Sequence, residues 1–251
     1  MFQYKDYGII LRAINFGEAD KLLTILTKDK GKIRAIAKGI RRARAKFSGS
    51  LEPFTYCHII IVQGKKDLDI ITGVDVIKSF KNLRTDLKRT ATAYLLSELI
   101  DKLVEIHEPQ FHIFQEFLSA LEKLNTEKKV DLILLKDYFL INILNILGYR
   151  PEIKICQKCH TKIKGLHDYF SPSLGGVICE KCESINGSAI PITLETLKII
   201  QLFTHNNINI IDKIPDKDKK ELSRILELFL EYLSDRKFHS LKFYKHILKE
   251  D

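Results

Sequence analysis

Hydrophobic and polar residues alternate in short runs through the first 80 positions of the chain. A period of two is typical of strands that bury one face. Turn-forming residues separate the runs, as at Phe16-Gly17 and around Gly31 and Gly64. The predicted strands cover residues 7–13, 21–27, 32–38, 53–63 and 68–80. Five strands this closely spaced predict a small barrel, and the oligonucleotide-binding (OB) fold is the commonest five-stranded type.

The hydrophobic period changes to about 3.6 after Asn82, which indicates helices. One helix is predicted from residue 82 to the residue before Pro109, and a second over residues 111–124. A third, over residues 130–147, is apolar on most of its surface, so we expect it to be buried at the centre of a bundle. Gly148 and Pro151 follow it, and both residue types end helices.

Helical periodicity returns after a segment that carries four cysteines. The predicted helices cover residues 194–203, with Thr193 as N-cap, residues 222–233 and residues 241–248. The predicted fold class is therefore α+β with several domains. An OB barrel over residues 1–80 is followed by a helical domain, formed by residues 81–152 and 191–251, which is interrupted by a cysteine-bearing insert over residues 153–190. We expect the helices on the two sides of the insert to pack together.

Positive charge is concentrated in the third predicted strand and the loop after it. Residues 28–46 contain nine Lys or Arg and one acidic residue, whereas the whole chain carries a net charge of only +9. A polyanion such as nucleic acid is the partner that this field suggests, and a solvated charge run is the alternative. Alternation of Ile33, Ala35 and Ala37 with charged residues favours a fixed surface. The candidate phosphate contacts are Lys32, Arg34, Lys38, Arg41, Arg42, Arg44 and Lys46.

Two further groups of residues leave alternatives open. Base stacking or core packing would explain the aromatic residues near the basic strand, and core packing is favoured for Phe54; the residues are Phe16, Phe47, Phe54 and Tyr56. A second basic patch near the last helix would be a phosphate contact, a dock for an acidic peptide tail or a solvated face. It consists of Lys237, Lys242, Lys245 and Lys249.

Length and composition indicate a folded protein without membrane spans. The chain has 251 residues, of which 45% are hydrophobic, enough for substantial cores. Its apolar runs are much shorter than the ~20 residues that a membrane helix needs. The N-terminal MFQYKDYGII contains charges before any apolar stretch develops, unlike a secretory signal. We therefore expect a cytoplasmic protein, in which thiols stay reduced.

Four of the five cysteines form two C-x-x-C pairs, and these give the most specific motif in the sequence. Cys156 and Cys159 are separated from Cys179 and Cys182 by nineteen residues. This spacing is typical of a four-thiolate Zn²⁺ site, with each tight turn supplying two ligands. The reducing compartment argues against disulfides, and the lack of a βαβ pattern argues against a redox pair. Four cysteines close the coordination shell, which favours a structural zinc over a catalytic one.

Catalytic motifs are missing from the sequence. It contains no G-x-x-x-x-G-K-[ST], G-x-G-x-x-G or G-x-S-x-G. His107, Glu108 and His112 approximate a zincin motif, but the spacing is one residue too long and Pro109 interrupts it. The remaining cysteine, Cys57, lies in a predicted strand and is interpreted as a small buried hydrophobe. The sequence therefore predicts a protein that is not an enzyme.

Several segments together resemble the RecO family of bacterial DNA repair proteins. They are FGEADKLLTILTKDKGKIRAIAKGIRRARAKFSGSLEPFTY, the GKKDLDII that follows, LGYRPEI, the two cysteine pairs and FSPSLGGVIC. The resemblance runs through nearly the whole chain in the expected order. It implies an N-terminal OB barrel, a helical domain and a zinc-binding insert. One departure is that His160 and Glu183 stand where such cysteine turns often have glycine.

The same resemblance implies a function in recombinational DNA repair. The family binds single- and double-stranded DNA and anneals complementary strands. With RecR it helps to load RecA onto strands coated by single-strand-binding protein, whose acidic C-terminal tail is a partner. It has no known enzymatic turnover. Association with the nucleoid and a single structural Zn²⁺ follow from this resemblance.

Two other function classes remain open at this stage. A zinc-ribbon RNA-binding or transcription accessory module would prefer RNA to DNA in competition. A metal-dependent nucleic-acid enzyme would form a product, and chelation would abolish that activity.

Overall fold

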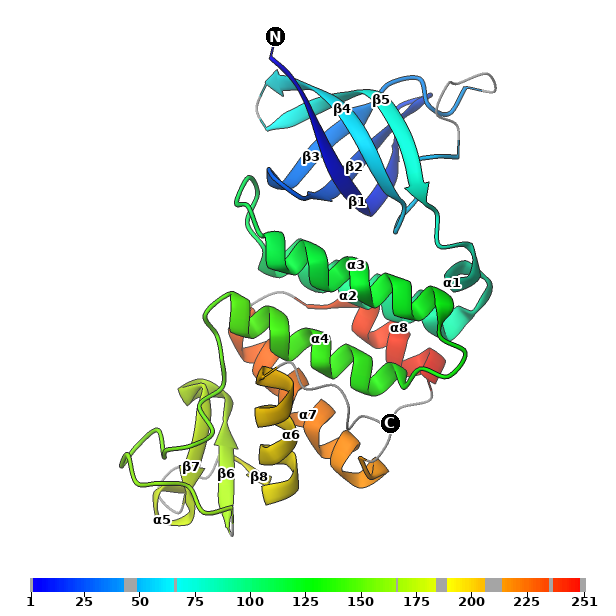
Figure 1. Ribbon diagram of the computed structural model, residues 1–251. Coiled ribbons are helices and arrows are strands. Elements are labelled where there is room, and N and C mark those ends of the chain that lie inside the picture. Colours follow the sequence, from blue (N-terminus) through cyan, green and yellow to red (C-terminus); the bar gives the residue numbers. More distant parts are fainter. Residues whose placement is uncertain are drawn as a thin grey trace. The chain divides into compact units, whose positions relative to one another are not determined.

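The computed structural model describes residues 2–42, 49–65, 67–165, 167–183, 189–205, 214–234 and 237–248. The chain forms two compact units (Figure 1). Unit 1 consists of Met1–Val130 with Phe238–Asp251, and unit 2 consists of Asp131–Lys237. These two units are defined by contacts within the chain, whereas the predicted domains are defined by sequence patterns. The predicted domain boundaries therefore stay a prediction.

Unit 1 begins with a closed five-stranded barrel in the strand order β1-β2-β3-β5-β4 (Figure 1). The strands are β1 (Gln3–Phe16), β2 (Asp20–Thr27), β3 (Gly31–Ala37), β4 (Tyr56–Lys65) and β5 (Leu68–Lys78). All pairs are antiparallel except the short parallel pairing of β3 with β5, at Ala35–Asp69 and Ile36–Ile70. The predicted barrel and fold class are confirmed.

The interior of the barrel is filled by alternate residues of its strands. Ile10, Ile25, Ile33 and Ile59 are fully buried there, because inward and outward side chains alternate along each strand. Cys57 is also fully buried, as predicted, and its thiol lies 3.6 Å from the carbonyl oxygen of Gly8. Burial raises the pKa of this thiol to about 12, so it stays protonated at neutral pH.

The helices of unit 1 are α1 (Lys81–Thr85), α2 (Leu87–Leu103), α3 (Phe111–Thr126) and α8 (His239–Leu248). The prediction of one unbroken helix from residue 82 was wrong. Asp86 has extended backbone angles, and its carboxylate accepts hydrogen bonds from the backbone N–H groups of Lys88 and Arg89. A side chain that caps a helix in this way starts a new helix at the next residue.

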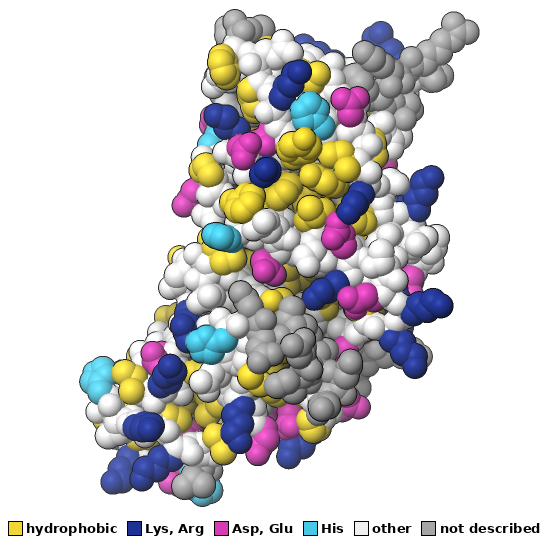
Figure 2. Space-filling model, in the orientation of Figure 1, with side chains coloured by type: hydrophobic (Ala, Val, Ile, Leu, Met, Phe, Trp, Pro, Cys, Tyr) yellow, Lys and Arg dark blue, Asp and Glu magenta, His cyan; other side chains and the backbone are white. Residues whose placement is uncertain are grey.

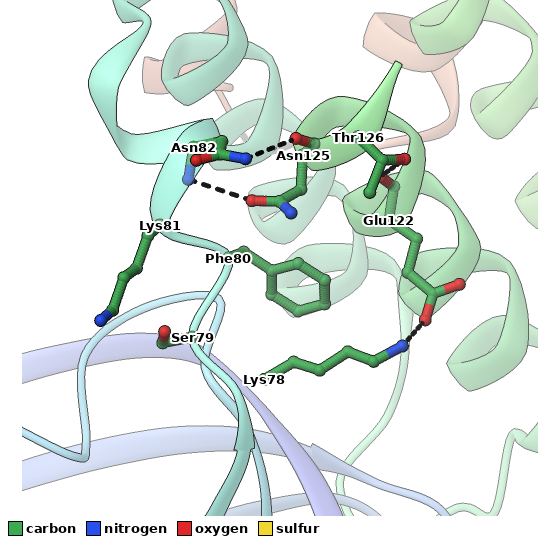
Figure 3. Close-up of a pocket in the computed structure, with 8 residues that line it drawn as sticks. All are labelled: Lys78, Ser79, Phe80, Lys81, Asn82, Glu122, Asn125 and Thr126. Atoms are coloured by element: carbon green, nitrogen blue, oxygen red, sulfur yellow. Dashed lines mark hydrogen bonds and ion pairs between the residues drawn. The ribbon is translucent and has the colours of Figure 1, made fainter.

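Unit 1 has a cavity of about 460 Å³ at the connection between β5 and α1 (Figure 3). Phe80 has left-handed backbone angles (φ 47°, ψ 53°), and its side chain is buried. The side-chain oxygen of Asn125 on α3 accepts hydrogen bonds from the N–H groups of Asn82 and Leu83, at 3.1 and 3.3 Å. Asn125 thereby satisfies backbone donors at the start of α1 and fixes α1 against α3.

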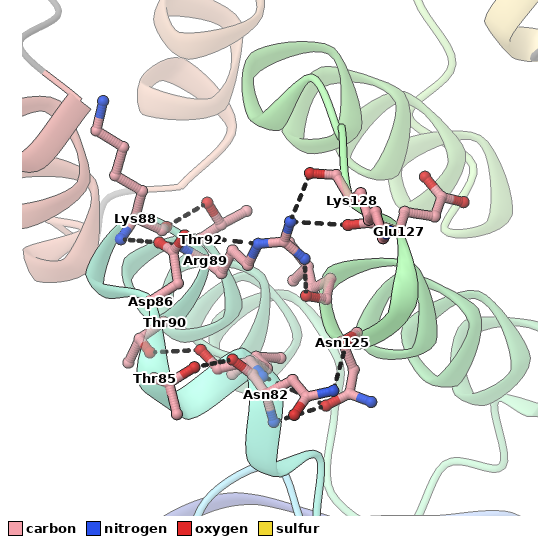
Figure 4. A network of polar contacts seen from close by, with 12 residues as sticks. Asn82, Thr85, Asp86, Lys88, Arg89, Thr90, Thr92, Asn125, Glu127 and Lys128 are labelled. Carbon is pink, nitrogen blue, oxygen red and sulfur yellow. Dashed lines mark hydrogen bonds and ion pairs between the residues drawn. The ribbon is translucent and has the colours of Figure 1, made fainter.

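Arg89 connects α2 to the C-terminal end of α3 (Figure 4). Its guanidinium donates to the carbonyl oxygens of Leu124 (2.6 Å), Glu127 (2.7 Å) and Lys128 (3.2 Å). Carbonyl groups at a helix C-terminus lack partners within the helix, and a cation there also complements the helix dipole. Arg89 therefore satisfies the end of α3 from a neighbouring helix.

We expect Arg89→Met to lower the free energy of unfolding of unit 1 by about 2–3 kcal/mol, because hydrogen bonds to a charged group contribute about that much. Urea unfolding followed by circular dichroism measures the change. Lys88→Met serves as the control. It removes a neighbouring exposed cation, for which the described residues show no side-chain hydrogen bond to the carbonyl groups at the end of α3. Equal stability of the two variants would contradict the assignment.

Unit 2 is built on α4 (Leu132–Ile146), α6 (Leu194–Thr204) and α7 (Asp216–Leu233). All residues from 134 to 144 of α4 are buried, which confirms the prediction of a central buried helix. Thr193 caps α6 through its hydroxyl, which accepts from the backbone N–H of Thr196. A three-stranded sheet in the order β7-β6-β8 completes unit 2, with β6 (Asp168–Ser171), β7 (Gly176–Cys179) and β8 (Ile190–Ile192).

A buried group of polar residues joins α4 to α7. Lys136 Nζ lies 3.0 Å from both Asp137 Oδ1 and Glu227 Oε1, and Ser223 Oγ donates a hydrogen bond to Asp137 Oδ2. Burial alone would lower the pKa of Lys136, but the two carboxylates outweigh it and hold this pKa above its usual value. Burial raises the pKa of Asp137, which Lys136 only partly offsets.

Candidate nucleic-acid interface and metal centre

The basic strand β3 presents its cations on the outer face of the barrel. Antiparallel pairing places Arg34 opposite Thr24 on β2, and Thr24 opposite Arg12 on β1. Directly paired residues point to the same face of a sheet, so Arg12, Thr24 and Arg34 form one row across three strands. Arg12, Arg34 and Lys38 are exposed. The strand fixes the direction of these charges, as its alternating pattern predicts.

An apolar row lies beside the cationic row on the same outer face. Ile14 pairs with Leu22, Leu22 with Ile36, and Ile36 with Ile70. Ile14 is 42% exposed, and Phe16 at the end of β1 is 50% exposed. This part of the barrel therefore combines positive charge with accessible apolar surface, a combination typical of single-strand binding surfaces.

Lys32 lies on the same outer face but is not available to a ligand. The helical part of unit 1 covers this end of β3, and Lys32 is only 6% exposed. Its ammonium donates to the carbonyl oxygen of Asp101 on α2 and lies 3.5 Å from the Asp101 carboxylate. Burial lowers the pKa of Lys32, and Asp101 only partly offsets this. We therefore correct the predicted set, because this lysine joins the barrel to α2.

Residues 106–108, which follow α2, cover this end of β3. The N–H of His107 donates to the Lys32 carbonyl oxygen at 2.8 Å, and Lys32 and Ile106 form a parallel bridge. Gly31 has φ of +72°, and a Cβ atom built on it would lie 2.1 Å from the Glu108 carbonyl oxygen. Only glycine permits this approach of the two backbones.

The turn after β3 holds two predicted contacts at the surface. Ile40 is buried in the barrel core, whereas Arg41 and Arg42 are exposed. The Arg41 N–H donates to the Ala19 carbonyl oxygen at 2.9 Å, and the Gly39 N–H donates to Asp20 Oδ1 at 2.7 Å. The turn is therefore anchored to β2 and the turn before it, and it presents two guanidinium groups from a fixed backbone.

The other predicted contacts and aromatic residues have mixed positions. Arg44, Lys46 and Phe47 lie outside the described residues. Phe54 is 1% exposed and packs against Tyr94 with a ring-centroid distance of 4.8 Å, so it is a core residue. Tyr56 lies on the outer face of β4, 6.2 Å from the ring of Tyr7.

Arg12 and Tyr7 are two exposed residues of the barrel that the sequence pattern does not single out. Arg12 is separated from the basic stretch by more than a dozen residues, and only the register of β1 with β2 brings it beside Arg34. Tyr7 is 41% exposed, and the Lys28 ammonium lies 5.8 Å from the centroid of its ring. Alternation alone does not place both residues outward, because they are five positions apart, and the pairing of β1 with β2 shifts register between Ile10 and Arg12.

The four cysteines of the two C-x-x-C pairs meet in unit 2. Their Sγ atoms all lie within 4.8 Å of one another, and those of Cys159 and Cys179 are 3.6 Å apart. Cys156 is buried, and its sulfur accepts hydrogen bonds from the N–H groups of Lys158 (3.5 Å) and Cys179 (3.4 Å). Cys182 belongs to the short helix α5 (Glu180–Glu183).

This arrangement fits a tetrahedral metal ion. Zinc–sulfur bonds of about 2.3 Å place the four sulfurs about 3.8 Å apart, close to the arrangement found here. A hydrogen bond with the Thr161 side chain lowers the pKa of Cys159 to about 6, whereas burial and neighbouring sulfurs raise the pKa of Cys182 to about 12. Four thiols this close cannot all ionise unless a cation balances their charge. The cluster can therefore hold a metal ion and is compatible with zinc.

The histidine in the first cysteine turn takes the conformation that glycine usually supplies. His160 has φ of +57°, in the left-handed region, and its N–H donates to the Cys156 carbonyl oxygen at 2.9 Å. Glu183, its counterpart after the second pair, is the last residue of α5 and has no such angle. The two turns that hold the sulfurs are therefore built differently.

Comparison with known proteins identifies the family. The model "Recombination protein O N terminal" matches residues 1–80, and "Recombination protein O C terminal" matches residues 84–242. A "DNA repair protein RecO" from Dehalococcoides mccartyi is 36% identical over 225 residues, which cover 90% of this chain and 87% of the relative. Proteins of the same description are 32% identical in Roseiflexus sp. (96% and 84% covered) and 29% identical in Bacillus pumilus (93% and 92% covered).

Within the part of the chain that the structure describes, every helix is too short or too polar to cross a membrane. The fold, the cysteine cluster and the matches over both parts of the chain agree with one another. The chain belongs to the RecO family of DNA repair proteins.

Proposed function

We propose that this protein binds single- and double-stranded DNA on the outer face of its barrel and anneals complementary strands. The observation that carries this proposal is the set of exposed cations on β1, β3 and the turn after β3, which consists of Arg12, Arg34, Lys38, Arg41 and Arg42. Phosphate contacts of this kind give affinity without sequence preference, because they release counterions from any strand.

Annealing needs such a surface, because two anionic strands approach each other only where their repulsion is screened. The exposed Ile14 and Phe16 offer apolar contact to unpaired bases beside the cations. In this proposal the protein performs no chemical conversion, and its work is to bring strands together. The bound metal is a structural Zn²⁺ held by Cys156, Cys159, Cys179 and Cys182, and it cross-links the two turns that carry these residues.

The proposed partners follow from membership of the RecO family. With RecR, the protein helps to load RecA onto strands coated by single-strand-binding protein, and it contacts the acidic C-terminal tail of that protein. It acts in the cytoplasm, on the nucleoid. In the basic patch near the last helix, Lys237 and Lys242 are exposed, Lys245 is half-buried and Lys249 lies outside the described residues. The tail site stays a prediction.

We expect the triple variant Arg34→Ala, Arg41→Ala and Arg42→Ala to bind single-stranded DNA about 100-fold more weakly at 0.1 M salt. Each phosphate contact contributes about 0.7 to the slope of log affinity against log salt, so the slope falls by about 2. Fluorescence anisotropy of a labelled oligonucleotide at several salt concentrations measures both quantities.

The control for this variant removes two exposed cations of unit 1 that lie outside the proposed surface. This control is Lys128→Ala with Lys129→Ala. Both lysines are exposed, and neither makes an ion pair with a described residue. An unchanged salt slope in the triple variant would overturn the assignment. An annealing assay on strands coated with single-strand-binding protein, with and without RecR, tests the partner part of the proposal.

A further inference from the structure

Unit 2 contains a cavity of about 450 Å³ between the first cysteine turn and α6. Its volume lies within the range of about 300–1,000 Å³ that is typical of ligand sites. Apolar side chains form part of its wall, among them Ile153, Ile163 and Leu197. Four lysines also line it: Lys154, Lys162, Lys164 and Lys198. We call this cavity the lysine pocket.

The charge of the lysine pocket is unbalanced. Its lining contains no acidic residue among the residues that the structure describes. All four lysines are exposed, and none of them makes an ion pair with a described residue. Ammonium groups around one cavity repel one another, and an anion entering the cavity relieves this repulsion. None of the four cysteines lines the cavity.

The backbone around the lysine pocket is well fixed. The Ile163 N–H donates to the Lys154 carbonyl oxygen at 2.9 Å, and Ile155 pairs with Lys162 in an antiparallel bridge. Two of the lysines therefore lie on opposite arms of the hairpin that the first cysteine pair closes. A Cβ atom at Gly165, which has φ of +76°, would lie 2.5 Å from Leu194 Cδ1, so this hairpin packs tightly against the start of α6.

We propose that the lysine pocket is a second binding site for single-stranded nucleic acid, in which lysines contact backbone phosphates and a sugar or base lies against the apolar wall. This proposal rests on the proposed function, because annealing requires two strands to be held at once. The barrel surface holds one strand in unit 1, and the lysine pocket supplies a site in unit 2. Figure 2 shows Lys and Arg side chains gathered over the part of unit 2 that carries β6 and β7.

The chemistry of the lining favours the phosphates of a nucleic-acid backbone over a single carboxylate ligand. Lysine is a flexible point charge with no geometric demand, whereas planar bidentate recognition of a carboxylate is typical of arginine. The lining contains four lysines and no arginine. Such a set tolerates successive phosphates at varied positions and gives no sequence preference.

The test compares two double variants of the full-length, metal-loaded protein. Lys162→Gln with Lys198→Gln removes one charge from the hairpin and one from α6. Lys217→Gln with Lys220→Gln removes two exposed charges from α7 in the same unit, outside the pocket lining. We expect the pocket variant to bind oligothymidylate about 25-fold more weakly at 0.1 M salt, at about 0.7 slope units per phosphate contact, and the control to bind normally. Thermal melting and zinc content show whether both variants are folded.

Cross-linking locates the strand independently of affinity. Ultraviolet irradiation of the wild-type protein with a bromodeoxyuridine oligonucleotide is expected to label peptides from residues 153–165 or 194–201 as well as the barrel. Unchanged oligonucleotide affinity in the pocket variant, with labels confined to the barrel, would overturn the pocket proposal. If the pocket variant instead loses binding of a polyglutamate peptide and keeps oligonucleotide binding, the pocket is a peptide site and the proposal is wrong.

The barrel triple variant, measured in the same titration, separates the two proposals. A loss of affinity in the barrel variant alone leaves the proposed function in place and removes only the second site. Normal affinity in both variants contradicts both proposals. Slower annealing by the pocket variant, with one strand still bound by the barrel, is the outcome that supports two strand sites.

Discussion

Replacing Lys136 by methionine is expected to lower the free energy of unfolding of unit 2 by about 3–5 kcal/mol, the usual cost of leaving a buried charge without its partner. Lys136 is 2% exposed, and its ammonium lies between the carboxylates of Asp137 and Glu227. Methionine fills the space of the lysine stem but leaves these two acids facing each other in an apolar interior. Urea unfolding of the variant and the wild type measures the difference.

The same variant has an expected pH dependence. The folded-state pKa of Asp137 is already raised by burial, and removing Lys136 raises it further. A carboxyl group with a raised folded-state pKa stabilises the fold at low pH, and this stabilisation is lost as pH rises through that pKa. As the pH falls from neutral to mildly acidic, the Lys136→Met variant should therefore regain part of its stability.

A companion variant distinguishes lost charge balance from lost packing. Lys136→Met combined with Asp137→Asn and Glu227→Gln removes all three charges while keeping similar volumes, so it should recover much of the loss. If Lys136→Met costs less than about 1 kcal/mol, in the range of exposed ion pairs, then the three groups are not a buried network.

Removal of the metal is expected to unfold the cysteine-bearing part of unit 2. Each cysteine turn contributes two sulfurs, and Cys156 also accepts two backbone hydrogen bonds. Binding of a structural metal ion contributes directly to folding, so its loss costs several kcal/mol. We expect one zinc per chain by elemental analysis. In Cys156→Ser we expect loss of the zinc and a lower melting temperature of unit 2, because its cysteine-bearing part unfolds.

Cys57→Ala is the control for the metal prediction. This cysteine is buried in the barrel of unit 1 and takes no part in the cluster. The control should keep its zinc, whereas its barrel loses stability through a small cavity. DNA binding by the barrel should survive in Cys156→Ser. Metal-free wild-type protein with unchanged melting would contradict a structural metal.

Local patterns were sufficient to predict the barrel strands, the central helix α4 and the cysteine cluster. The period of two in β1 to β5 and the unbroken apolar run of α4 are properties of neighbouring residues, and C-x-x-C spacing fixes which sulfurs share a turn. The break at Asp86 has a local signal too, since an aspartate before a helix is a favoured N-cap. The long apolar stripe on both sides of it outweighed that signal.

Contacts between distant segments could not be predicted. Lys32 and Arg34 have the same sequence pattern, yet only Lys32 meets α2, about seventy residues away. Lys136 and Asp137 interrupt an apolar helix, and their partners on α7 lie roughly ninety residues further along. The lysine pocket needs the docking of a hairpin against α6. In each case the register of a sheet or the packing of a helix decides the role of a residue.

Strand β3 has one further consequence, for the behaviour of the protein at high concentration. It pairs with β2 along its length, with β5 at Ala35 and Ile36, and with the segment around Ile106 at its start. Open strand edges template pairing between chains and lead to aggregation. Closure of the barrel at β3 protects this edge, so concentrated solutions of the protein should not aggregate by pairing of this strand between copies.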